Sequence, residues 1–141
     1  MGQNIHAHIE VKHNDAWEHF SAPCVIRDYK LYRLMGSNRD VAGLRTVIGV
    51  KPGMPADASI ITRRCLELDI DQYGESIVNT AHVIDAAGIA ALQDAYRNAR
   101  PELSLPESDL EETIFHCYIA GNPIFAHDGF EDVRIVYWFD N

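Results

Sequence analysis

The sequence predicts an α+β fold in which a mixed or mostly antiparallel sheet includes both terminal strands, with two to three helices packed on one face. Three observations support this. Residues 3–12 alternate apolar and polar side chains, residues 132–139 are rich in β-branched and aromatic side chains, and the stretches between them contain residues that cap helices. The length of 141 residues is typical of one domain, so residues 1–141 are treated as a single domain.

The first strand is predicted from its period of two. Ile5, Ala7 and Ile9 should face the core, and His6 and His8 should lie on the opposite face. Side chains opposite a core are usually solvated, so we expect the histidine face to be exposed to water.

A β-hairpin is expected to follow the first strand. His13, Asn14 and Asp15 form the predicted turn, and residues 16–20 return as the second strand. Trp17 is the largest apolar side chain of this strand and is its expected core anchor.

Three helices are predicted from their N-caps and their apolar spacing. They are residues 29–35 after Asp28, residues 58–68 after Asp57, and residues 86–99 after Asp85. Their expected core-facing residues are Leu31, Leu34 and Met35 in the first, Ile61, Cys65 and Leu68 in the second, and Ile89, Leu92 and Tyr96 in the third.

The segments between the helices are predicted with less regular structure. Residues 37–55 read as mostly loop with a strand at 46–50, and residues 69–74 read as an acidic turn. The remaining predicted strands are residues 76–84, 113–119 and 132–139.

The net charge of −9 is unevenly distributed along the chain. Residues 1–64 hold nine Lys/Arg and six Asp/Glu, a charge of +3, whereas residues 65–141 hold three Arg and fifteen Asp/Glu, a charge of −12. An acidic half disfavours direct binding of nucleic acid and suits docking on a basic, nucleic-acid-binding surface of another protein. If the halves fold onto separate faces, a dipole would steer such an encounter.

Composition also predicts the compartment. No apolar run approaches the roughly 18 residues that span a membrane, and residues 1–11 lack the pattern of a signal peptide. The three cysteines are odd in number and form no Cys-x-x-Cys pair, which favours reduced thiols. We therefore expect a cytoplasmic protein without a membrane partner.

Both ends of the chain resemble one family. The opening Met-Gly-Gln-Asn-Ile-His of residues 1–6, with Glu10 four residues on, and the close Val-Arg-Ile-Val-Tyr-Trp-Phe-Asp-Asn of residues 133–141 are similar to a family of small, uncharacterised phage and prophage proteins. Residues 27–29 and 53–57 also look like family features. The resemblance implies a phage origin and the cytoplasm of a bacterial host, but no activity.

Two departures bear on what the family resemblance implies. The family usually has Asp where this chain has Asn4, and it often carries a His-Ser-His-Ser stretch where residues 79–82 read Asn-Thr-Ala-His. A family site built from Asp and His would be incomplete in this chain.

The strand face of His6, His8 and Glu10 is the first candidate site. Two imidazoles two residues apart on a strand can converge on one metal ion, and a third ligand would have to come from His82 or His116. This is the basis for a metal-dependent hydrolase or nucleotide-processing enzyme. A bare His-x-His pair more often lies on a solvated strand face, and amides such as Asn4 are poor zinc ligands, so we expect no bound metal and no cofactor.

A basic segment is the second candidate. It comprises Arg27, Lys30, Arg33, Arg39, Arg45 and Lys51. Arg27 and Arg39 could hold a phosphate or carboxylate, which is the basis for a nucleotide-signal binding protein. We favour the simpler interpretation that these side chains form ion pairs with the acidic half of the chain.

An acidic run after Pro106 is the third candidate. It comprises Glu107, Asp109, Glu111 and Glu112. These residues either mimic phosphate toward a basic partner or decorate the N-terminus of a helix, where negative charge is stabilising; the second interpretation is favoured.

The function that this reasoning favours is a phage or prophage accessory protein that acts by binding. Its expected partner is a host protein, possessing a basic, nucleic-acid-binding surface, and its expected effect is inhibition of that protein or of a host defence. The metal-dependent enzyme and the nucleotide-signal binding protein are the alternatives.

Overall fold

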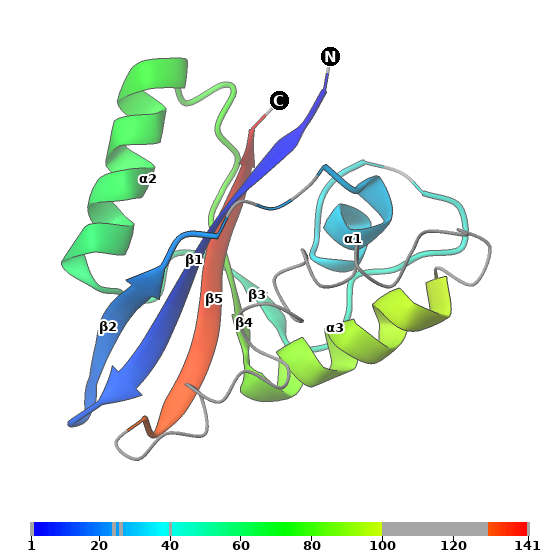
Figure 1. Cartoon of the computed structure of the whole chain (residues 1–141). Helices are drawn as coiled ribbons and strands as arrows, with labels where there is room; N and C mark the ends of the chain where they lie inside the picture. Colours follow the sequence, from blue (N-terminus) through cyan, green and yellow to red (C-terminus); the bar gives the residue numbers. More distant parts are fainter. Residues whose placement is uncertain (1, 24, 26, 40, 100–129, 141) are drawn as a thin grey trace.

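The computed structural model describes residues 2–23, 25, 27–39, 41–99 and 130–140, which form three layers (Figure 1). A five-stranded sheet is the middle layer, α2 covers one face, and α1 and α3 cover the other. The elements are β1 (Asn4–His13), β2 (Ala16–Ser21), α1 (Tyr29–Leu34), β3 (Val50–Pro52), α2 (Ile60–Tyr73), β4 (His82–Asp85), α3 (Ala86–Ala99) and β5 (Asp132–Asp140). The predicted α+β class is confirmed, but the helices lie on both faces of the sheet rather than one.

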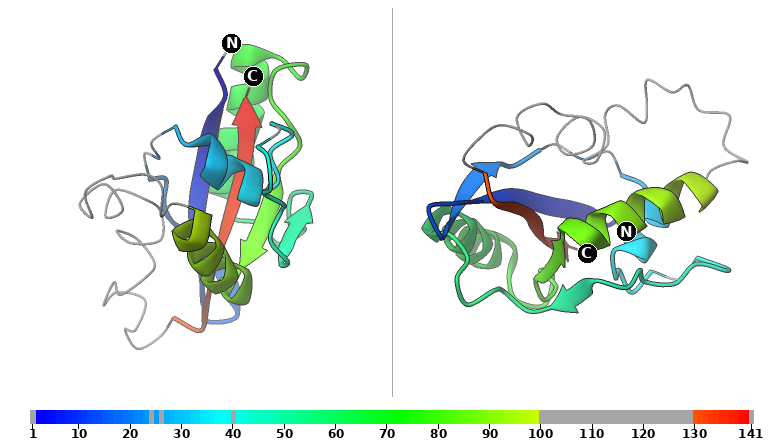
Figure 2. Two further views of the ribbon diagram at one scale, coloured as in Figure 1. Left: turned by 90° about the vertical axis from the view of Figure 1, so that its right-hand side faces the viewer. Right: turned by 90° about the horizontal axis from the view of Figure 1, so that it is seen from below.

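Among the described residues, every strand pairing is antiparallel and the order is β2-β1-β5-β4-β3. The first and last strands are therefore neighbours in the middle of the sheet (Figures 1 and 2). In their register, Asn4 pairs with Asp140. The two strands from the C-terminal half, β5 and β4, are flanked by strands from the N-terminal half.

The register of β1 agrees with the prediction. Ile5, Ala7 and Ile9 are buried in the main core, on the face that α1 and α3 cover. Because successive side chains of a strand point to opposite faces, His6 and His8 lie on the face that α2 covers.

The main core is closed by the two helices whose caps the sequence predicts. The Asp28 carboxylate accepts hydrogen bonds from the backbone N–H groups of Lys30 (3.0 Å) and Leu31 (3.3 Å), which starts α1. The hydroxyl of Tyr96 on α3 donates to the other Asp28 oxygen, so the same cap joins the two helices. The predicted core residues of both helices are buried: Leu31, Leu34, Met35, Ile89, Leu92 and Tyr96.

Helix α3 starts as predicted. It packs against the loop before β3 at a contact between two glycines, Gly88 of the helix and Gly49 of the loop. The Asp85 carboxylate accepts from the N–H of Gly88 at 2.8 Å, as an N-cap does. A Cβ on Gly49, which has a φ of 107°, would lie 2.8 Å from the Cα of Gly88. The absence of both side chains is what lets this loop and this helix touch.

Helix α2 differs from the prediction in its bounds. It begins after Ser59 rather than Asp57, and it continues through most of residues 69–74, which were predicted as a turn. Asp57 does not cap the helix because its carboxylate pairs with Arg134 at 2.9 Å, and the hydroxyl of Ser59 accepts the capping hydrogen bond instead.

The rotation of α2 also differs from the prediction. Ile61 and Leu68, predicted to face inward, are exposed. Thr62 is buried against the sheet, and Leu66 and Ile70 pack in the smaller core around Trp138.

Three predictions on strands need correction. The strand predicted at residues 46–50 is β3, displaced toward the C-terminus, and the strand predicted at 76–84 is only β4 plus a bridge between Val78 and Asp140. Trp17 is half-buried, with the Arg134 guanidinium 4.0 Å from its ring centre, and Trp138 is fully buried instead.

The strand predicted at residues 113–119 lies outside the described residues. The longest helices that the structure describes, α2 and α3, have 14 residues each. No helix in this part of the chain has the length and apolar character needed to cross a membrane.

Candidate functional site

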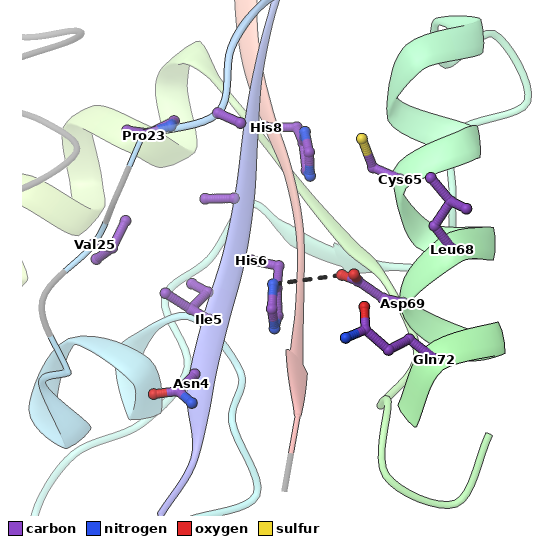
Figure 3. A pocket seen from close by; sticks show the side chains of 12 residues that line it. Asn4, Ile5, His6, His8, Pro23, Val25, Cys65, Leu68, Asp69 and Gln72 are labelled. Atoms are coloured by element: carbon purple, nitrogen blue, oxygen red, sulfur yellow. Dashed lines mark ion pairs between the residues drawn. The ribbon is translucent and has the colours of Figure 1, made fainter. Parts of the chain in front are cut away.

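The face of the sheet under α2 carries the polar side chains His6 and His8 of β1, which point toward α2 (Figure 3). Between β1 and α2 lies an open pocket of about 610 Å³. Its lining includes His6, His8, Cys65, Leu68, Asp69 and Gln72, which point into the gap from the two elements. Such a volume is within the range of small-ligand sites.

His6 lies between two carboxylates. Its Nε2 is 2.7 Å from an oxygen of Asp140 on β5, and its Nδ1 is 3.4 Å from an oxygen of Asp69 on α2. The same Asp69 oxygen accepts a hydrogen bond from the indole N–H of Trp138 at 2.9 Å. This chain of contacts joins β1, β5 and α2.

His8 and His19 form a neutral pair. The Nδ1 of His8 is 3.0 Å from the Nε2 of His19, so one ring donates its N–H to the other. Burial, with the neighbouring His19, lowers the pKa of His8 to about 4, and burial also lowers the pKa of His19. His8 stacks on Trp138 with ring centres 4.8 Å apart. These two imidazoles are therefore uncharged at neutral pH.

Glu10 is fully buried and accepts hydrogen bonds from both sides. One oxygen accepts from the N–H of Ser59 and the hydroxyl of Thr62, each at 2.8 Å, and so holds the start of α2. The other lies 2.9 Å from Nε and 2.8 Å from Nη2 of Arg134, its cross-strand neighbour on β5. The expected solvation of this strand face is thus wrong for Glu10 and His8, which are 0% and 6% exposed because α2 covers them.

The carboxylates of Glu10 and Asp57 are stabilised in their charged form by the groups that donate hydrogen bonds to them. Burial alone would raise the pKa of Glu10, but the hydrogen bonds from Ser59, Thr62 and Arg134 outweigh it and lower that pKa. The hydrogen bond from Arg134 likewise lowers the pKa of Asp57. We call Glu10, Arg134, Asp57, Ser59 and Thr62 the α2 clasp, because they fix the N-terminus of α2 to the sheet.

His82 is not brought to this site. It pairs with Tyr137 on β5 and stacks on its ring at 5.7 Å, on the opposite face from His6 and His8. The strand β5 also separates β4 from β1. The idea that His82 completes a metal site with the two histidines is therefore wrong, and His116 lies outside the described residues.

Three side chains of the basic segment donate hydrogen bonds to neutral oxygen atoms rather than to carboxylates. Arg27 donates to the side-chain oxygen of Asn4 through Nε (3.2 Å) and Nη2 (2.8 Å). Lys30 donates to the carbonyl of Ala99, and Arg33 to Thr46 and Ser37. Within the described residues, Arg27, Lys30 and Arg33 do not make the predicted ion pairs.

Arg39 is not among the described residues that line the pocket. The guanidinium of Arg39 is over the ring of Tyr29, 5.1 Å from its centre, beside α1. The acidic run of Glu107, Asp109, Glu111 and Glu112 lies outside the described residues.

Among the described residues, the side chains at the pocket fit neither a metal-binding site nor a nucleophilic cysteine. Within them, no group of three or more His, Cys, Asp or Glu is placed to hold a metal ion. Burial and the nearby Asp69 carboxylate raise the pKa of Cys65, whereas a nucleophilic cysteine needs a lowered pKa. Cys65 is a free thiol at the pocket wall.

Four residues of the site escaped the sequence reasoning: His19, Asp69, Arg134 and Asp140. The one available signal was the pairing of the two terminal strands, which sets the acid Glu10 opposite the base Arg134. Opposite charges across a strand pair are a usual source of sheet stability. Nothing in the sequence pointed to Asp69, which was assigned to a turn.

Comparisons with protein-family models, with curated proteins and with solved structures found no match. The function proposed next therefore rests on the residues and their geometry.

Proposed function

We propose that the protein is a phage or prophage accessory protein that acts by binding a host protein through the outer side of α2. The observation that carries the proposal is the exposure of large apolar side chains on this helix. Ile60, Ile61 and Leu68 are 76%, 55% and 63% exposed. The family resemblance of the two chain ends supports the phage origin.

Helix α2 is held to the sheet by polar contacts as well as by Leu66 and Ile70, which pack around Trp138. Its sheet-facing side includes Thr62 and Asp69, both of which form polar contacts with the sheet. Its apolar side chains Ile61 and Leu68 are left facing water, two helical turns apart on one side. An exposed apolar patch with a polar border is typical of a protein-binding surface.

The charges beside this surface indicate the chemistry of the partner. Asp71 and Glu75 are exposed, at the C-terminal end of α2 and just after it, and the chain as a whole carries −9. Glu67 contributes less, because Arg64 pairs with it at 3.1 Å. The fitting partner has an apolar groove with a basic border, as nucleic-acid-binding proteins often present. Covering such a surface would inhibit that host protein, including one that serves a host defence.

The test uses the protein as bait in a bacterial host lysate, beside a variant of α2 and a matched control. In the variant, Ile61→Ser and Leu68→Ser remove the exposed apolar stripe. In the control, Ile48→Ser removes an apolar side chain that is 93% exposed in the loop before β3. Changes at such exposed positions alter stability by less than about 0.5 kcal/mol, so all three proteins should unfold at similar urea concentrations.

We expect the wild type and Ile48→Ser to retain the same host protein and the double variant to lose it. Retention by all three, or enrichment no better than with an unrelated acidic bait, would contradict the proposal.

A further inference from the structure

The pocket between β1 and α2 opens beside the outer side of α2. Leu68 belongs to both, since it is exposed on the helix and lines the pocket. Cys65 and Gln72, which follow the same line of the helix, also line it (Figure 3). A partner that covers the apolar stripe of α2 would therefore lie over the pocket mouth.

Asp69 is the anionic group of the pocket. Its carboxylate is held in place by the indole N–H of Trp138, a side chain that is fully buried and cannot move aside. His6 approaches the same oxygen at 3.4 Å, which is longer than an ordinary hydrogen bond. A fixed carboxylate that keeps hydrogen-bonding capacity is suited to accept a charged donor.

The net charge around Asp69 is negative. Asp69 and Asp140 are two acids that share one imidazole, His6, so the acids outnumber the bases in this group. Among the described residues that line the pocket, none is Lys or Arg. Arg27, which lies between β2 and α1, donates to the side chain of Asn4. A cationic group is therefore what this pocket attracts.

The shape of the lining favours a flat cation. His6 and His8 are both nearly parallel to Trp138, at interplanar angles of 12° and 18°, so their rings form one aligned row along β1. A guanidinium group is planar, stacks on aromatic rings and offers several N–H donors to a carboxylate. A lysine ammonium lacks that planar shape, and the apolar walls at Pro23 and Leu68 suit the methylene stem of arginine.

We propose that this pocket binds the guanidinium group of an arginine that the partner protein presents beside its apolar contact with α2. The inference rests on the proposed function for the source of the arginine. The chemistry of the pocket itself can be measured without any partner.

The first measurement is an NMR titration of the whole protein with methylguanidinium, using methylurea as the neutral analogue of the same shape, at constant ionic strength. The indole N–H of Trp138 reports the event because it donates to Asp69. We expect methylguanidinium to shift this resonance with saturation and methylurea to leave it in place. An equal response to both, or none to either, would overturn the proposal.

The second measurement repeats the titration with Asp69→Asn, which keeps an oxygen for the Trp138 hydrogen bond but removes the charge. Affinity should fall by about tenfold or more, as for the loss of a charged hydrogen-bond partner. The matched control, Glu67→Gln, removes an exposed acid two residues away on the same helix and should change affinity less than about twofold. Equal affinity of Asp69→Asn and wild type would overturn the proposal even if the probe binds.

The third measurement separates the two possible sources of the guanidinium. Arginine in the middle of a short blocked peptide should bind more tightly than free arginine, because free arginine must also bring its charged α-ammonium and α-carboxylate groups against the apolar wall at Leu68. Tighter binding of free arginine would overturn the assignment to a partner protein. Since these titrations contain no host protein, they can fail while capture through α2 succeeds, and the reverse.

Discussion

Glu10 is the residue that contributes most to the placement of α2. It is fully buried, and both of its oxygens are occupied, by Ser59 and Thr62 on one side and Arg134 on the other. A buried ion pair stabilises only when its geometry is good and the remaining hydrogen bonds are made. In the α2 clasp, Nε and Nη1 of Arg134 donate to Glu10 and Asp57, whereas Nη2 lies 2.8 Å from Glu10 without making a hydrogen bond.

We predict that Glu10→Gln lowers the free energy of unfolding by about 3 kcal/mol, because it leaves the buried guanidinium of Arg134 without its main counter-charge. Urea denaturation followed by circular dichroism measures this. The matched variant Asp57→Asn removes the other partner of Arg134, whose side chain is 67% exposed, and should cost less than about 1 kcal/mol. Equal losses in the two variants would contradict the assigned role of Glu10.

His8 should make the stability of the protein depend on pH. Its pKa is about 4 in the folded chain and 6.5 in its unperturbed form. Between these values the unfolded chain binds more protons than the folded chain, so the free energy of unfolding falls as the pH is lowered. The contribution of His8 should amount to about 2 kcal/mol between pH 7 and pH 5.

Urea midpoints over that pH range test the prediction with two variants. His8→Gln should flatten the dependence, whereas His13→Gln, at the hairpin end of β1, should leave it as in the wild type. The groups that face His8 are His19, His6, Asp69 and Glu10, and the two carboxylates only partly offset the effects of burial and His19. Identical slopes for wild type and His8→Gln would exclude His8 as the cause.

At the scale of elements, the alternation of β1 and the caps of α1 and α3 could be predicted because each depends on neighbouring residues. The rotation of α2 could not. Ile61, Cys65 and Leu68 have helical spacing, and hydrophobicity alone turns that side to the core. The polar contacts of Thr62 and Asp69, seven residues apart, instead turn the neighbouring side inward, about a quarter turn away. Their partners lie on strands at both ends of the chain.

His82 illustrates a second limit of the sequence. Its face is decided by the pairing of β4 with β5, in which it lies opposite Tyr137. Because side chains alternate along a strand, shifting this register by one residue would have moved His82 to the α2 face. Four residues of strand carry too little alternation to settle that register from sequence.

The packing of α3 predicts an unusual effect at Gly88. Replacing a helix glycine by alanine normally stabilises by about 1 kcal/mol. Here the new Cβ would lie 2.6 Å from Cγ1 of the fully buried Ile84. We therefore expect Gly88→Ala to lower the free energy of unfolding, by about 1–3 kcal/mol, as overpacking does.

Thermal unfolding compares this variant with Ala90→Gly, an exposed position of the same helix. That control should lose about 1 kcal/mol from helix propensity alone. A higher melting temperature for Gly88→Ala would show that Ile84 can move aside, and would refute the close packing of α3 on β4.

At the scale of the whole molecule, the strands that the structure describes do not sort the uneven charge of the chain onto two separate faces. The sheet places β5 and β4, from the acidic half, between β1 and β3, from the half that carries +3. The described strands therefore give little reason to expect a large electric dipole across the molecule. Asp69, one of the acids of the C-terminal half, lies in the pocket. Electrostatic attraction of a partner would depend on the overall charge and on the acids near α2.

The neighbouring positions of β1 and β5 also affect how the chain folds. Glu10 and Arg134, which meet across this pair, are 124 positions apart in the sequence. Closing so long a loop costs entropy before any contact repays it, and sheets built from such distant pairs form slowly. During translation, β1 emerges from the ribosome well before β5 has been made. Until β5 arrives, Ile5, Ala7 and Ile9 belong to a hairpin with one apolar side open, the kind of nascent species that chaperones protect from aggregation.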